Sequence, residues 1–86
     1  MNNPTPSHAH SEPLATIARR RRRALELTQA ELADLADCSE RFVYMLERGK
    51  GTVQLAKVLD VLHALGLTLV VEPGHQPVSR TQHADD

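Results

Sequence analysis

The sequence predicts an all-α fold of four helices followed by one short strand. Three observations support this prediction. Apolar residues recur at helical spacing between about residues 14 and 65, Thr, Ser and Gly stand where helices should begin and end, and the branched residues after Gly66 favour an extended chain. The 86 residues allow one small domain. Its core must be built from Leu, Val, Ile and Ala, because Phe42 and Tyr44 are the only aromatic residues.

The chain divides into an arm, a folded domain and a tail. Residues 1–12 are rich in Pro, Asn, Ser and His, so we expect a disordered arm. Residues 74–86 have a similar composition and are expected to form a disordered tail. The domain at residues 13–73 is so small that a single copy should be only marginally stable, which makes a homodimer the expected state.

The first helix is expected over Pro13–Glu26. Proline suits the first helical turn, where its missing N–H would have no partner in any case. The apolar residues Leu14, Ile17, Ala18 and Leu25 share one face. Arg21 lies between them, and its aliphatic stem can follow that face.

Two short helices should follow, separated by a tight turn. Thr28 and Glu31 form a T-x-x-E capping box, which predicts a second helix over Gln29–Ala36. The third helix is expected over Ser39–Arg48, with the serine as its cap, and Gly49 supplies the left-handed residue that ends it. The core-facing residues of the two helices are expected to be Leu32, Leu35, Ala36, Val43 and Leu46.

The fourth helix is expected over Thr52–Leu65, and a strand over Leu67–Glu72. The apolar stripe of this helix consists of Leu55, Val58, Leu59, Leu62 and Leu65. The strand residues are Leu67, Thr68, Leu69, Val70 and Val71. This strand has no partner within the chain, so we expect it to pair antiparallel with the same strand of a second copy. Packing of the segment on its own helices is the alternative.

The charge is unevenly distributed, although the net charge is only −1. Residues 14–50 contain eight basic and six acidic side chains, with five consecutive arginines at 19–23. A basic stripe on a small domain indicates a polyanionic partner.

Several function classes are disfavoured. No run of about 18 apolar residues could span a membrane, and the N-terminus does not resemble a secretory signal, so a cytoplasmic protein is expected. Cys38 is the only cysteine of the sequence, and we interpret it as a small turn residue rather than a redox sensor. Of five histidines only His8 and His10 lie close in sequence, so no metal or cofactor is expected. No catalytic motif is present, and an enzyme is not expected.

The segment Leu27–Gly51 carries the most specific signal. It reads LTQAELADLADCSERFVYMLERGKG and closely resembles the phage-repressor/Cro-like (XRE) helix-turn-helix family, over about residues 17–67. The resemblance implies a lambda-repressor-like domain of four to five helices whose third helix enters the DNA major groove. Together with the strand, the chain most resembles the HipB-type antitoxins. Asp37-Cys38 departs from the family, which usually has Gly followed by a β-branched residue.

The resemblance implies which residues contact DNA. The expected base-reading residues on the third helix are Glu40, Arg41, Tyr44 and Met45. Arg41 can donate two hydrogen bonds to guanine, whereas Glu40 can accept from cytosine or simply favour the helix dipole. Met45 would make only apolar contacts, and partial burial is its alternative. The expected phosphate contacts are Gln29, Ser39, Arg48, Lys50, Arg19 and Arg23.

Glu47 is an acid close to the expected DNA surface. The resemblance implies that it forms a structural ion pair with an arginine of the first helix, most simply Arg22. Arg21 is the alternative partner if the helix register slips by one residue.

These features predict a transcriptional repressor that binds a palindromic operator in double-stranded DNA as a homodimer. The HipB resemblance implies an antitoxin that represses its own operon and holds a HipA-like toxin kinase. The alternatives are a stand-alone XRE-type regulator and an antitoxin whose main role is to neutralise the kinase. A neighbouring gene for a kinase-like toxin would distinguish them.

Overall fold

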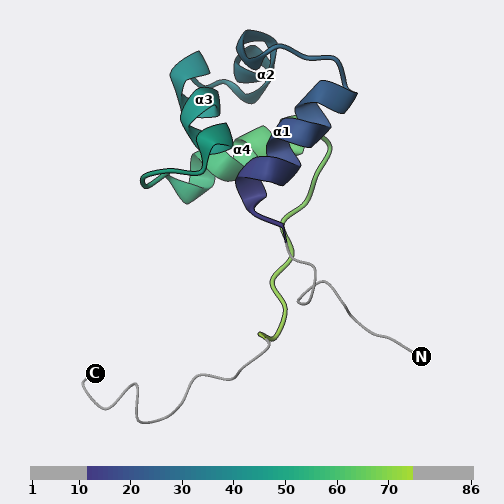
Figure 1. Cartoon of the computed structure of the whole chain (residues 1–86), viewed down its shortest axis with the longest axis vertical. Helices are drawn as coiled ribbons and strands as arrows, with labels where there is room; N and C mark the ends of the chain where they lie inside the picture. Colours follow the sequence, from purple (N-terminus) through teal and green to yellow (C-terminus); the bar gives the residue numbers. More distant parts are fainter. Residues whose placement is uncertain (1–11, 75–86) are drawn as a thin grey trace.

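The computed structural model describes residues 12–74 and contains four α-helices in that range (Figure 1). These are α1 (Leu14–Ala24), α2 (Gln29–Ala36), α3 (Glu40–Arg48) and α4 (Leu55–Ala64). The predicted all-α class is confirmed. The expected arm and tail fall almost wholly at residues 1–11 and 75–86, outside the described residues.

Side-chain caps set the boundaries of α2 and α3. The Thr28 hydroxyl accepts from the backbone N–H of Glu31 at 3.0 Å, and the Glu31 carboxylate accepts from the backbone N–H of Thr28 at 2.8 Å. The Ser39 hydroxyl accepts from the backbone N–H of Phe42 at 3.0 Å. The predicted boundaries of both helices are confirmed, because local hydrogen bonds of this kind depend on neighbouring residues alone. By contrast, α1 ends two residues before its predicted end at Glu26, and α4 begins three residues after its predicted start at Thr52.

Asp37 forms the turn between α2 and α3 in a left-handed conformation. Its φ is 57° and its ψ is 49°, in the region that glycine adopts without a steric penalty. The backbone N–H of Cys38 donates to the Ala33 carbonyl at 3.0 Å, which closes the end of α2. The turn therefore forms with an aspartate at the position where the family usually has Gly.

The core is entirely apolar within the described part of the chain. It consists of Ala18, Leu32, Ala33, Ala36, Val43, Leu46, Val58, Val61, Leu62 and Leu65. The expected burial of Val43 and Leu46 is confirmed. The prediction was wrong for Leu35 and Leu55, which are 63% and 61% exposed. On α2, Leu35 lies about 100° around the helix from the middle of its buried face. Leu55 is the first residue of α4 and lies beyond the core.

The segment after α4 leaves the helical bundle (Figure 1). Leu67 packs against the core, but Val70 and Val71 are 71% and 90% exposed. The expected strand at residues 67–72 is not formed, and no strand is present among residues 12–74. A strand needs a neighbouring strand to accept and donate its backbone hydrogen bonds, and this part of the chain contains none.

None of the helices within the described range is long and apolar enough to cross a membrane.

Candidate nucleic-acid interface

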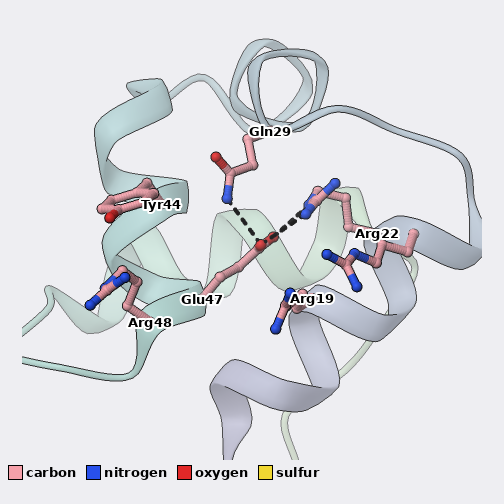
Figure 2. Close-up of a pocket in the computed structure, with 7 residues that line it drawn as sticks. Arg19, Arg22, Gln29, Tyr44, Glu47 and Arg48 are labelled. Atoms are coloured by element: carbon pink, nitrogen blue, oxygen red, sulfur yellow. Dashed lines mark hydrogen bonds and ion pairs between the residues drawn. The ribbon is translucent and has the colours of Figure 1, made fainter.

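Glu47 accepts hydrogen bonds from two other elements of the domain (Figure 2). The Arg22 guanidinium of α1 donates from Nε to Oε2 at 2.6 Å and from Nη2 to Oε1 at 3.0 Å. Its remaining nitrogen, Nη1, donates to the Leu27 carbonyl at 2.8 Å. The two side chains are 11% and 4% exposed. Glu47 thus connects α3 to α1 and, through Arg22, to the loop that leads into α2.

The alternative pairing of Glu47 with Arg21 does not occur. The Nε of Arg21 donates instead to the Leu65 carbonyl at the end of α4, at 2.8 Å. This bond satisfies one of the terminal carbonyls that a helix leaves without an internal partner. Its two residues are 44 positions apart, so no local pattern in the sequence could have revealed it.

Gln29 also donates to Glu47. Its Nε2 lies 3.1 Å from Oε1 of the carboxylate, on the opposite side from Arg22 (Figure 2). The expected phosphate contact of this amide is therefore restricted, because one of its two N–H groups is already occupied. Sequence reasoning missed this bond, since it treated the start of α2 and the end of α3 separately.

The hydrogen bonds keep Glu47 ionised. Burial raises the pKa of Glu47, but the hydrogen bonds from Arg22 and Gln29, together with the positive charge of Arg22, outweigh it and hold the pKa below its usual value. The hydrogen bond to Glu47 raises the pKa of Arg22. The pair thus remains charged at neutral pH.

A basic groove of about 390 Å³ lies around this pair (Figure 2). The groove is lined by Arg19, Arg22, Arg23, Gln29, Tyr44, Glu47 and Arg48. Because Glu47 neutralises Arg22, the other three arginines give the groove an excess of positive charge. The Arg48 guanidinium lies 5.5 Å from the centre of the Tyr44 ring, within the range of a cation–π contact. The structure thus brings four of the six expected phosphate-contacting residues to one place.

Next to this groove is a second hollow on the outer side of α3. It is lined by Gln29, Glu40, Arg41 and Tyr44, so three of the four expected base-reading residues gather there. Gln29 and Tyr44 line both hollows. The other two phosphate candidates lie elsewhere, since Ser39 caps α3 and Lys50 follows its end.

Met45 does not join the other expected base-reading residues. It is half-buried and lines a separate, mainly apolar groove with Leu14 and Val53. Of the two interpretations open from the sequence, partial burial describes its position. The α-helical rotation between Tyr44 and Met45 separates their side chains by about 100°.

Cys38 is a half-buried residue in the turn between α2 and α3. Burial raises the pKa of the Cys38 thiol, which disfavours the reactive thiolate. No three potential metal ligands cluster in this part of the chain. His8 and His10 lie outside the described residues.

Comparison with known proteins identifies the family. A family model described as "Helix-turn-helix" matches residues 17–71, which is more than half of the chain. The chain belongs to the helix-turn-helix family. A relative in Sinorhizobium fredii (strain NBRC 101917 / NGR234), named "Uncharacterized HTH-type transcriptional regulator y4mF", is 39% identical over 64 residues, which cover 73% of this chain and 84% of the relative. In this helix-turn-helix domain, α2 and α3 form the motif, and α1 adds the arginines that border it. Neither match names the HipB-type subgroup.

Proposed function

We propose that this protein is a transcriptional regulator that binds double-stranded DNA through α3. The observation that carries the proposal is the basic groove, in which Arg19 and Arg23 of α1 face Arg48 of α3. Such a surface attracts the phosphate backbone, and the adjoining hollow on α3 exposes side chains that can read base edges. Membership of the helix-turn-helix family and the name of the relative, an HTH-type transcriptional regulator, support the same function.

In the proposed complex, α3 lies in the major groove. Arg41 donates to guanine O6 and N7, while Glu40 accepts from a cytosine amino group. Tyr44 contacts a phosphate or a thymine methyl group. The expected phosphate contacts are Arg19, Arg23, Arg48, Lys50 and Ser39. Gln29 contributes mainly its backbone N–H at the start of α2, because its side chain is held by Glu47.

The proposed regulator is a homodimer. Exposed valines on a segment that leaves the bundle are unfavourable in water, and antiparallel pairing with a second copy would cover them and satisfy the strand hydrogen bonds. A two-fold axis through this pairing would present two α3 helices to successive major grooves, about 34 Å apart. The proposed operator is therefore a palindrome, and occupation of a promoter by the dimer would repress it.

A narrower proposal is that the protein is the antitoxin of a HipBA-like operon and represses its own promoter. It rests on the resemblance to HipB-type antitoxins, with a HipA-like kinase as the protein partner. A kinase gene beside this one, and a kinase that co-purifies with the protein, would support it. A gene that stands alone would favour a stand-alone regulator.

Selection from a random duplex DNA library at low and at moderate salt tests the proposed function. We expect a palindrome whose half-sites are about one helical turn apart, enriched at both salt concentrations. The matched control is Arg41→Ala, which should enrich a degenerate sequence. Recovery of no consensus by the unaltered protein, with all binding lost at moderate salt, would overturn sequence-specific regulation.

A further inference from the structure

A mainly apolar groove of about 250 Å³ lies at the opposite end of α3 from the base-reading hollow. Its walls are the start of α1, with Pro13 and Leu14, the last turn of α3, with Met45, and the loop before α4, with Val53. Val53 is 41% exposed. Neither the basic groove nor the hollow on α3 includes these residues, and Lys50 at the rim is the one lining residue that is also a proposed DNA contact.

The floor of the groove lies where α1 and α3 approach closely. Gly49 has a φ of 69°, and a Cβ at this position would lie 3.2 Å from the Cβ of Ala15. Glycine is therefore favoured at this position, both for the left-handed end of α3 and for the close contact with α1. The groove is thus already formed in the single chain, as binding sites usually are.

The chain itself exposes an apolar segment of the right chemistry. Leu67 packs against the core, Leu69 is 44% exposed and Val71 is 90% exposed. In an extended chain, residues two apart share a face, so Leu69 and Val71 would continue the face on which Leu67 meets its own core. In the same conformation, Val70 would lie on the opposite face. In that conformation the segment would have an apolar face that its own bundle leaves exposed beyond Leu67.

We propose that the apolar groove of one copy receives Leu69 and Val71 of a second copy. This proposal rests on the homodimer proposed above and specifies what the dimer interface contains. Figure 1 shows the segment leaving the bundle at the end where α1 begins, which is the end that holds the groove. Antiparallel pairing sends each segment back over the partner's bundle, so one two-fold contact fills both grooves at once.

The proposal gives Met45 a role in the dimer. Met45 lies on α3 three residues before Arg48, which lines the basic groove. A partner segment seated against Met45 would hold the end of α3 while its outer face engages DNA. Thioether side chains adapt well to irregular apolar contacts of this kind.

Disulfide formation between two variants of the full chain tests the proposal directly. In a Cys38→Ala background, a Val53→Cys chain is mixed with a mass-tagged Val71→Cys chain and mildly oxidised. A disulfide requires two Cα atoms within about 7 Å, so we expect an abundant mixed product. The matched control is Val70→Cys, on the other face of the segment, which should give at least fivefold less mixed product.

Sedimentation of the Cys38→Ala chain distinguishes a wrong groove assignment from the absence of a dimer. If this chain is a dimer but Val71→Cys gives no more mixed product than Val70→Cys, the groove assignment is wrong and the dimer stands. If the chain is a monomer at tens of micromolar, both the dimer and the groove proposal fail. As an independent measurement, Val53→Asp should weaken the dimer at least tenfold, whereas Leu35→Asp, on an exposed leucine outside the groove, should not.

Discussion

Arg22 and Glu47 join α1 to α3 through two hydrogen bonds of 2.6 and 3.0 Å in a largely buried position. This pair fixes the end of the proposed recognition helix to the helix that carries the arginine run. Gln29 donates to the same carboxylate, so the start of α2 is fixed as well. One acidic side chain therefore links the three helices that would meet DNA.

Removal of Arg22 should destabilise the domain strongly. An Arg22→Ala variant leaves the Glu47 carboxylate buried without its positive partner, and we expect the free energy of unfolding to fall by about 3–5 kcal/mol. Urea denaturation followed by circular dichroism measures this change. Arg20→Ala is the matched control, because Arg20 pairs with Glu12 in an exposed position and its removal should change stability little. Equal losses in both variants would show that the Arg22–Glu47 pair has no special structural role.

The stability of the domain should fall at acid pH partly through Glu47. Its folded-state pKa lies below the usual value of 4.5, so the stabilisation is present above that pH and is lost as the pH falls through the folded pKa. Denaturation at a series of pH values between 7 and 3 should show this loss. A Glu47→Gln variant should be less stable at neutral pH and should show a shallower decline. An unchanged acid slope in that variant would contradict the assignment.

Arg41 and Lys50 should affect DNA binding differently. Arg41→Ala should reduce discrimination at one operator position by about 1–3 kcal/mol, because it removes a bidentate contact to a base. Lys50→Ala should weaken binding to all sequences alike. It should also reduce the slope of log affinity against log salt concentration by about one. Titrations of operator and scrambled duplexes at several salt concentrations distinguish the two effects. If both variants lose only non-specific affinity, Arg41 does not read a base.

Replacement of Asp37 by glycine should stabilise the turn between α2 and α3. The φ of 57° is strained for a residue with a Cβ and is free of strain for glycine. We expect Asp37→Gly to raise the unfolding free energy by up to about 1 kcal/mol, measured as a higher Tm. Asp34→Gly, inside α2, should lower it by a similar amount. A lower Tm for Asp37→Gly would mean that the aspartate contributes more than the strain costs.

A proline at position 70 should separate dimerisation from folding. Proline lacks the N–H that strand pairing requires, so Val70→Pro should yield a monomer in sedimentation. Val70 is 71% exposed in the single chain, so the Tm measured at low protein concentration should be nearly unchanged. A dimer that persists in this variant would exclude pairing through the segment.

The sequence alone determined the helices that make the motif. The caps of α2 and α3 are formed by Thr28, Glu31 and Ser39 through hydrogen bonds to residues three positions away. Such local caps can be predicted from neighbouring residues alone. The basic character of residues 19–23 was equally visible. The resemblance to a known family supplied the expectation of an Arg22–Glu47 pair.

Only the tertiary structure decided where the remaining side chains point. Gln29 is occupied by Glu47, Arg21 by the carbonyl of Leu65, and Met45 lies in an apolar groove rather than with the other expected readers. These contacts join residues from different helices, and their geometry depends on how the helices pack around the core. The strand expected after Gly66 was not formed, because backbone hydrogen bonding in a strand requires a second strand beside it.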